Sequence, residues 1–383
     1  MRLPLFDLQC AGCGEEYPES GLPAACPRCG GCFAYRDGLA WRGATGDPGL
    51  RRWAPALGLA PDELPAHALA GPPALFAPGD GGGAVWICQQ GSAPAGSHKE
   101  RGAEVMAAAA HRRGVRELFL DSSGNAGIAV ARAAAARGIR CTVLVPESTP
   151  ARKLERMRAA GAAVEVMRGD REAAHAAADE RRRRLPYAAP FLQPSFLAGM
   201  ATLAWEIAAE IGTPLPEHWL LPAGNGSLLL GLALGLDCLE RAGIAGRLPA
   251  LHAVQLEGYA ALAAEGPGAA RPGPPTAAGV AIARPPRRAD MRRAIAASGG
   301  DVTRVSEEEI AAARRELAEQ GWTTDPTGAA AFAAWRRRPD LRRGAEGGPG
   351  SPDGQGGPGP AASASPGRPT CLLIVTSREE GLD

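Results

Sequence analysis

The sequence has few aromatic residues, almost no net charge and no long apolar stretch. Aromatic side chains make up 5% of the 383 residues, and 42 basic residues face 41 acidic ones, for a net charge of +1. Because so balanced a chain has no global field to hold it on nucleic acid or an anionic membrane, we expect neither as a partner. The longest apolar stretches, such as residues 228–239, fall short of the roughly 20 residues that span a bilayer. No charged segment followed by an apolar one opens the chain as in a signal peptide, so we expect a cytoplasmic protein.

The length and the apolar pattern indicate an α/β protein of more than one domain. A chain of 383 residues is long enough for two or three domains. Between about residues 84 and 335, short β-rich apolar segments alternate with alanine-rich segments of helical character. This alternation predicts doubly wound parallel sheets with helices on both faces. The strands are expected at residues 84–89, 117–121, 141–146, 163–167, 219–223 and 251–257, with a last one at 371–377.

Two segments stand apart from this pattern. Residues 344–369 are rich in glycine and proline and contain hardly any apolar side chain, so they predict a disordered insertion before the last strand. Residues 1–37 contain two C-x-x-C pairs, formed by Cys10 with Cys13 and by Cys26 with Cys29.

Four thiolates at this spacing are typical of a closed, structural zinc site, so we expect a zinc-ribbon-like segment over residues 1–37. Two disulfides are the alternative, which a reducing cytosol disfavours. Cys32 is a fifth thiol with no assigned role. Because four protein ligands leave no open coordination position, we expect this metal to support folding and not to activate water.

Three loop motifs follow expected strands and precede expected helices. Residues 94–102, PAGSHKERG, place Lys99 at a helix start, where the helix dipole disfavours the charged amine. Residues 121–127, DSSGNAG, form a turn whose N–H groups suit an anion such as a carboxylate. Residues 221–231, LPAGNGSLLLG, lack both the third glycine of a dinucleotide motif and the GK[ST] of a P-loop, so one small phosphate is the expected guest. Singly, each motif is also compatible with an ordinary capped turn.

Taken in this order, the three motifs resemble those of threonine synthases and their relatives, the fold type II pyridoxal-phosphate (PLP) enzymes. PAGSHKERG resembles the family's N-P-T-G-S-F-K-D-R-G, SSGNAG its asparagine loop and PAGNGSLLLG its phosphate loop. Residues 279–287 and 325–334 also resemble segments of this family, and some members have an N-terminal ribbon. The resemblance implies a tryptophan synthase beta-like fold, PLP as cofactor, a small amino-acid substrate and, by analogy, a homodimer.

The resemblance also implies a domain division and roles for individual residues. The large PLP-binding domain would comprise residues 38–112 and 201–383, and residues 113–200 would form the smaller domain with the asparagine loop. Lys99 would form the Schiff base and move protons, and Asn125 would bond the cofactor's ring oxygen. The phosphate would be held by Gly224, Asn225, Gly226 and Ser227, and the substrate carboxylate by Ser123, Gly124, Asn125 and Ala126. Thr376, or alternatively Ser377, would face the pyridine nitrogen.

The sequence departs from the family at several of these positions. His98 and Glu100 replace the usual Phe and Asp beside Lys99, Ser377 replaces a glycine, and Gly328 stands where the family often has serine. A neutral hydroxyl at the pyridine nitrogen makes a weaker electron sink than a carboxylate there, which favours elimination and replacement over transamination.

The function implied is a lyase of the threonine synthase type, which converts O-phosphohomoserine and water to threonine and phosphate. This chemistry needs a second anion site, for which Arg101 and Lys153 are the candidates. The alternatives are β-replacement or β-elimination on another amino acid, as in cysteate synthase-like or serine/threonine dehydratase-like enzymes, and an inactive zinc-ribbon homologue.

Overall fold

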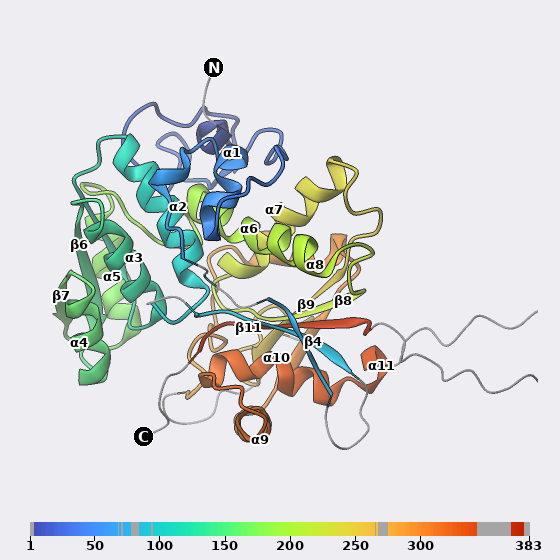
Figure 1. Ribbon diagram of the computed structural model, residues 1–383. Coiled ribbons are helices and arrows are strands. Elements are labelled where there is room, and N and C mark those ends of the chain that lie inside the picture. Colours follow the sequence, from blue (N-terminus) through green and yellow to red (C-terminus); the bar gives the residue numbers. More distant parts are fainter. Residues whose placement is uncertain are drawn as a thin grey trace, which may run out of the picture.

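In the computed structural model, the chain forms a large sheet, a smaller sheet and a short N-terminal hairpin (Figure 1). The structure describes residues 4–67, 69, 72–77, 84–92, 95–264, 266, 275–342 and 369–378. The insertion expected at 344–369 lies outside the described residues except for Pro369.

The large sheet takes its strands from distant parts of the chain. In spatial order they are β10 (Val302–Val305), β9 (Ala250–Leu256), β8 (His218–Pro222), β11 (Cys371–Val375), β4 (Val85–Gln89) and β3 (Ala74–Phe76). β11 comes from the end of the described chain and pairs in parallel with β4 on one side and β8 on the other. All five of its residues are buried, as expected of a strand covered on both faces.

Helices cover both faces of this sheet, because its strands are apolar on both sides (Figure 1). Leu372 and Ile374 of β11 face the apolar cluster that includes α6 and α7, while Leu373 and Val375 face the cluster that includes α9 and α10. The helices of this part are α2 (Lys99–Arg112), α6 (Pro194–Ile211), α7 (Ser227–Arg241), α8 (Arg288–Ala297), α9 (Glu307–Glu319), α10 (Pro326–Arg337) and α11 (Pro339–Arg342).

The smaller sheet consists of three consecutive parallel strands, β5 (Glu117–Asp121), β6 (Arg140–Pro146) and β7 (Ala162–Met167). They alternate with the helices α3 (Asn125–Ala135), α4 (Ala151–Ala159) and α5 (Arg171–Arg181). The strands and helices occur where the apolar pattern placed them. The predicted doubly wound α/β architecture is therefore confirmed.

Two expectations need correction. β3 pairs with β4 in the antiparallel sense, although parallel sheets were expected, because residues 77–84 are too few for the crossover of a dozen or more residues that parallel pairing requires. The domain boundary expected at residue 200 falls inside α6, one continuous helix. We propose instead that the smaller domain ends before Pro194.

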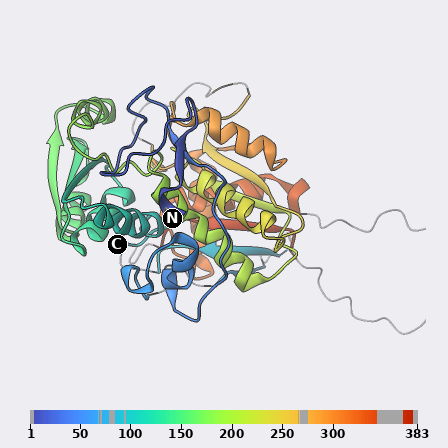
Figure 2. The same cartoon turned by 90° about the horizontal axis from the view of Figure 1, so that it is seen from above.

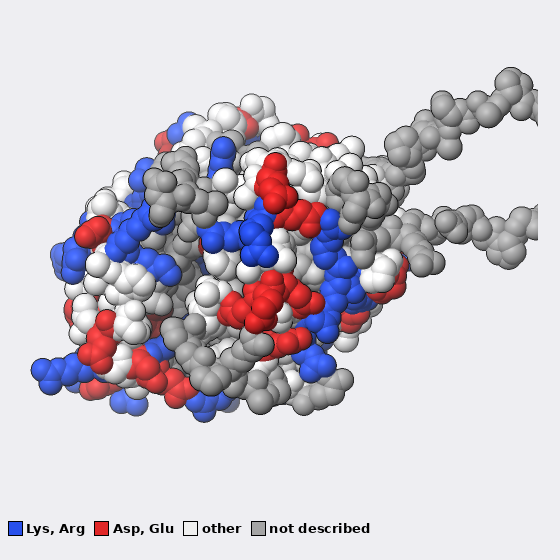
Figure 3. Space-filling view, turned by 90° about the horizontal axis from the view of Figure 1, so that it is seen from below, with Lys and Arg blue, Asp and Glu red and all other residues white. Residues whose placement is uncertain are grey.

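The N-terminal part lies across one side of the molecule, at the top of Figure 1 and facing the viewer in Figure 2. It contains the hairpin β1 (Leu8–Cys10) and β2 (Phe33–Tyr35), the short helix α1 (Ala54–Leu57) and the 3-10 turns η1 (Pro4–Phe6), η2 (Gly49–Trp53) and η3 (Pro61–Glu63). Within the described residues, no helix combines the length and the apolar character needed to cross a membrane. On the face shown in Figure 3, acidic and basic side chains are interspersed.

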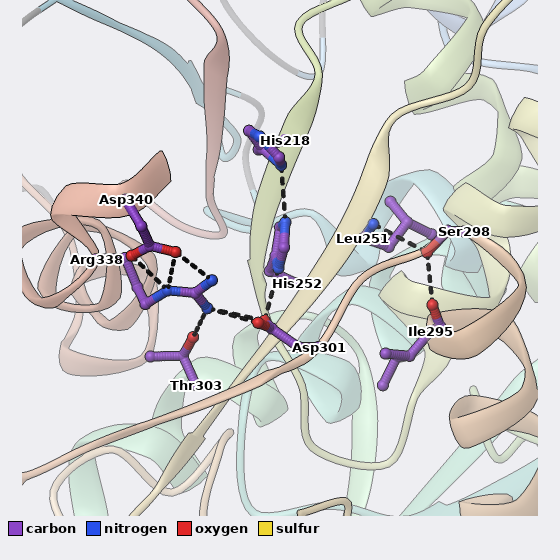
Figure 4. Close-up of polar contacts among 9 residues, drawn as sticks. All are labelled: His218, Leu251, His252, Ile295, Ser298, Asp301, Thr303, Arg338 and Asp340. Atoms are coloured by element: carbon purple, nitrogen blue, oxygen red, sulfur yellow. Dashed lines mark hydrogen bonds and ion pairs between the residues drawn. The ribbon is translucent and has the colours of Figure 1, made fainter. Parts of the chain in front are cut away.

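A polar cluster closes the edge of the large sheet at which β8 and β9 begin (Figure 4). His218 Nδ1 lies 3.1 Å from His252 Nε2, and His252 Nδ1 lies 2.6 Å from a carboxylate oxygen of Asp301. Arg338, which follows α10, donates to both oxygens of Asp301 at 2.8 and 2.9 Å and also binds Asp340. Since His252 is buried, the cluster satisfies its ring nitrogens and ties α10 to the sheet.

We expect Asp301→Asn to lower the free energy of unfolding by about 1–2 kcal/mol at neutral pH, because it weakens two charge-assisted contacts at a half-exposed carboxylate. The hydrogen bond from His252, with the charge of Arg338, lowers the pKa of Asp301. A lowered carboxyl pKa stabilises the folded state above the unfolded pKa of about 4, and this stabilisation is lost as the pH falls further. Urea unfolding should therefore show a gap between the two proteins that narrows from pH 7 to pH 3. Asp340→Asn, at a more exposed carboxylate, is the control, and an equal loss for both variants would contradict the assignment.

Candidate active site

The three predicted loop motifs line one cavity of about 320 Å³ between the two sheets. It lies where β5, β8 and β11 end and where α2, α3, α7 and α10 begin. The carboxyl ends of parallel strands are where ligands bind in folds of this kind. The residues predicted for the site that line this cavity are Lys99, Ser123, Gly124, Asn125, Ala126, Lys153, Gly224, Asn225, Gly226, Ser227, Thr376 and Ser377.

Lys99 is the first residue of α2, as the sequence predicted. Its Nζ donates to Ser227 Oγ at 2.5 Å, so the amine already contacts the glycine loop that precedes α7. Burial lowers the pKa of Lys99 to about 8, because a charged amine is less stable away from water. From the sequence we expected the helix dipole to cause such a shift, and the structure adds burial as a cause.

The glycine loop before α7 is shaped for a small anion. Gly226 has φ +94° and precedes the first turn of α7, whose N–H groups have no acceptor within the helix. At Gly224, a Cβ atom would lie 2.1 Å from the carbonyl oxygen of Gly279. Any side chain at Gly224 would therefore push the loop away from the segment that closes it. N–H groups at a helix start that lack helical acceptors are the groups that bind small anions in proteins.

The asparagine loop presents a second set of N–H groups. Asn125 begins α3, and Ser122 Oγ accepts a hydrogen bond from the N–H of Gly127 at 3.1 Å, which shapes the turn between them. The side chain of Asn125 donates to a carboxylate oxygen of Asp325 at 3.3 Å. Asp325 immediately precedes α10. The site thus combines two turns that present N–H groups with a buried amine whose pKa is lowered to about 8.

Comparison with known proteins decides the family. The model of the family described as "Pyridoxal-phosphate dependent enzyme" matches residues 71–349. The chain belongs to this family.

Among curated proteins, the chain is similar to the threonine synthase of Methanocaldococcus jannaschii, with 28% identity over 66% of this chain and 65% of the relative. It is also similar to the L-serine dehydratase/L-threonine deaminase of Mus musculus, with 34% identity over 40% of this chain and 48% of that protein. The chain thus spans less than two thirds of each relative's length. Among solved structures, maize serine racemase superposes with a TM-score of 0.62 at 19% identity, covering 82% of this chain and 90% of that one, which confirms the fold.

The residues present fit the cofactor of this family. PLP carries its aldehyde and its phosphate arm on neighbouring ring carbons, and the cavity offers a glycine-lined loop next to a buried lysine. The pyridine nitrogen would need a hydroxyl from the end of β11. Ser377 Oγ is already engaged, because it accepts from the N–H of Asp325 at 3.3 Å and lies 3.2 Å from Thr324 Oγ1. No hydrogen-bond partner for the hydroxyl of Thr376 occurs among the described residues.

The engaged Ser377 belongs to a crowded polar corner. A Cβ atom at Gly328 would lie 2.0 Å from Thr324 Oγ1 and 3.3 Å from Ser377 Oγ. The serine that the family often has at this position would therefore collide with the hydroxyl of Thr324 and lie in tight contact with that of Ser377. The departures at Gly328 and Ser377 thus belong together, and they leave Thr376 as the available hydroxyl.

Arg101 does not reach the cavity, contrary to the prediction of a substrate-binding role. It is 1% exposed, and its guanidinium pairs with Glu206 and donates to Thr202 on α6 at 3.1 Å. Arg101 follows Lys99 by two residues on α2, which turns its side chain to a different face of the helix. Its charge supports the packing of α2 on α6.

The structure instead brings three cations from the smaller sheet's helices to the cavity wall. Lys153 was predicted for this role, whereas Arg156 and Arg171 were missed. Lys153 and Arg156 are three residues apart on α4 and so share a face, a spacing visible in the sequence but not distinctive among so many arginines. Within the described residues, none of the three has a carboxylate at ion-pair distance.

The four ribbon cysteines are gathered as predicted. One Sγ atom from each of Cys10, Cys13, Cys26 and Cys29 lies within 4.8 Å of the others. The Cys10–Cys29 and Cys13–Cys26 sulfur atoms are 3.4 and 3.7 Å apart, beyond a disulfide bond of about 2.05 Å and close to the roughly 3.8 Å between two thiolates on one tetrahedral zinc ion. Cys32 lies outside this group.

The ribbon packs on its own chain and braces the cavity. Tyr35 donates from its hydroxyl to the carbonyl of Pro194 at 3.1 Å. The side chain of Gln193 donates to the carbonyls of Leu22 in the ribbon, at 3.2 Å, and Tyr187, at 2.7 Å. Residues 190–191, which line the cavity, lie between these contacts.

Proposed function

We propose that the protein is a PLP-dependent lyase of the threonine synthase type, which converts O-phosphohomoserine and water to threonine and phosphate. Membership of the family does not identify the substrate, but one observation favours a phosphorylated one. Besides the glycine loop before α7, the cavity has a second possible anion site, a basic region formed by Lys153, Arg156 and Arg171. A substrate with a phosphate of its own requires such a region, whereas serine and threonine have no distal anion to place there.

We assign the cofactor to the residues that fit it. Lys99 would hold PLP, with Gly224, Asn225, Gly226 and Ser227 around the phosphate and Asn125 at the ring oxygen. Thr376, rather than Ser377, would face the pyridine nitrogen. PLP bound in this way withdraws electrons from the α carbon of an amino acid.

The chain's own residues would orient the substrate and move its protons. The first N–H groups of the asparagine loop, from Ser123 to Ala126, would hold the α-carboxylate. The amine of Lys99, with a pKa of about 8, can both accept and return a proton near neutral pH. Lys153, Arg156 and Arg171 would hold the distal phosphate and neutralise its charge as it leaves.

A dehydratase acting on serine or threonine is the second candidate. The similarity to the mouse dehydratase, at 34% identity over 40% of this chain, supports it. A replacement reaction on a phosphorylated amino acid, as in cysteate synthase-like enzymes, would use the same two anion sites. An inactive homologue is disfavoured because Lys99, Asn125 and the glycine loop before α7 all line the cavity.

We further propose that Cys10, Cys13, Cys26 and Cys29 bind one structural zinc ion. The cluster satisfies the donor set and spacing of such a site. The contacts through Tyr35 and Gln193 support a role for the ion in holding residues 190–191 in the cavity wall.

The cofactor assignment predicts a yellow protein whose colour depends on Lys99. Borohydride should fix PLP to Lys99, and digestion followed by mass spectrometry should find the adduct on its peptide. Lys99→Ala should bind PLP weakly and remain colourless after dialysis, while Lys153→Ala should stay yellow because it lies outside the proposed cofactor contacts. An adduct on another lysine would disprove the assignment.

If the basic region of Lys153, Arg156 and Arg171 binds the substrate's phosphate, substitutions in it should lower kcat/KM for the phosphorylated substrate selectively. Arg156→Gln should lower kcat/KM for O-phosphohomoserine about tenfold or more, as expected for the loss of one charged hydrogen bond. Arg158→Gln is the matched control, since this arginine lies exposed on the same helix and does not line the cavity. Product analysis should find threonine and phosphate. Faster turnover of serine or threonine, unaffected by Arg156→Gln, would favour the dehydratase.

The zinc site predicts one zinc ion per chain by elemental analysis. Cys13→Ser and Cys29→Ser should each lower the zinc content and the melting temperature, because the remaining thiolates no longer close the tetrahedron. Cys32→Ser, which changes a thiol outside the cluster, should retain both. Full stability of the two ligand variants without metal would argue against a structural role.

A further inference from the structure

His98, the residue immediately before Lys99, takes no part in the proposed reaction so far. It is 8% exposed and lines the cavity. The resembling family usually has Phe at this position. An imidazole in place of a phenyl ring adds two nitrogen atoms, and buried polar atoms normally have hydrogen-bond partners.

One of these nitrogen atoms, Nδ1, contacts the residue that follows β11. His98 Nδ1 lies 3.0 Å from the carbonyl oxygen of Thr376, and the backbone N–H of His98 donates to the same oxygen at 2.9 Å. Because a carbonyl oxygen only accepts hydrogen bonds, Nδ1 must carry a proton. Burial, together with the nearby charges of Lys99 and Arg101, lowers the pKa of His98 well below its ordinary value. The ring is therefore neutral, and Nε2 has a lone pair.

The contact of His98 is the side-chain part of a larger junction. The N–H of Arg378 donates to the carbonyl of Gly96 at 3.2 Å, and Ser97 forms an antiparallel bridge with Ser377. Residues 96–98 thus run alongside residues 376–378. Two backbone contacts and one imidazole together join the start of α2 to the end of β11.

We propose that His98 is a positioning residue, which sets the place of the Thr376 hydroxyl relative to Lys99 by binding the Thr376 carbonyl through Nδ1–H. This role rests on the proposed function, because it matters only if Lys99 and Thr376 hold the same cofactor. A Phe at position 98 leaves the backbone contacts intact and removes only the imidazole tie. The effect of its loss should therefore be a change in cofactor geometry and not a loss of folding.

The first test reads the ring directly. The chain has six histidines, so a ¹⁵N-histidine spectrum of the PLP-loaded protein, compared with that of His98→Asn, identifies the signals of His98. We expect a protonated Nδ1 and an unprotonated Nε2 that persist when the pH is lowered to about 6. A proton on Nε2, or a doubly protonated ring at that pH, would overturn the proposal.

The second test separates positioning from packing. Asn at position 98 can place its amide N–H near the position of Nδ1, whereas Phe cannot donate. We expect His98→Phe to shift the PLP absorbance and to weaken PLP retention about three- to tenfold, as for one lost hydrogen bond. His98→Asn should stay within about twofold of the unaltered protein. If both variants are impaired equally, the hydrogen bond is not what matters.

A double variant shows whether His98 acts through Thr376. In a Thr376→Val background, which lacks the hydroxyl but keeps the carbonyl, His98→Phe should have little further effect on PLP absorbance or retention. An undiminished effect would overturn the proposed route. An unaltered chain that holds no PLP would reject the proposed function and this role together, whereas a wrong tautomer would reject only the role of His98.

Discussion

The candidate site depends on the pairing of β11 between β4 and β8. This five-residue strand, apolar on both faces, brings Thr376 and Ser377 from the end of the described chain beside Lys99, which follows β4. The same pairing sets β8 one strand away, so that the glycine loop ending in Ser227 meets the lysine. Without β11 the two halves of the cofactor site would have no common edge, because parallel strands align their carboxyl ends only when they are hydrogen-bonded into one sheet.

The cavity divides its polar groups between the two sheets. The large sheet contributes Lys99, the glycine loop and the final hydroxyls, whereas the smaller sheet contributes the asparagine loop and the cations of α4 and α5. Asn125 and Asp325 connect the two sides. This division agrees with the proposed assignment, in which the large sheet supplies all the cofactor contacts except Asn125 and the smaller sheet supplies the substrate contacts. Differences between enzymes of this fold should therefore concentrate on the smaller sheet's helices.

The ribbon contacts a segment that has no regular secondary structure of its own. Residues 187–193 run from the smaller sheet to α6 and belong to no helix or strand, and two of them, Pro190 and Phe191, line the cavity. The side chain of Gln193 donates to the carbonyl of Leu22 in the ribbon and to the carbonyl of Tyr187 within the segment. With the proposed zinc ion bound, the ribbon, whose small apolar core forms around Tyr17 and Phe33, would support this part of the cavity wall.

Local periodicity, spacing and turn chemistry were enough to predict the cysteine cluster, the loops around Lys99, Asn125 and Gly226, and most of the strands. They did not predict the short strands β1, β2, β3 and β10. Which cations face the cavity depends on tertiary packing. Arg101 is turned to Glu206, while Arg156 faces the cavity, since the direction of a side chain depends on which helix face is packed. The hydrogen bond from His98 to the Thr376 carbonyl spans 278 residues. The contact of Ser377 with Thr324, which favours Thr376 as the available hydroxyl, spans 53 residues. No local pattern in the sequence encodes either contact.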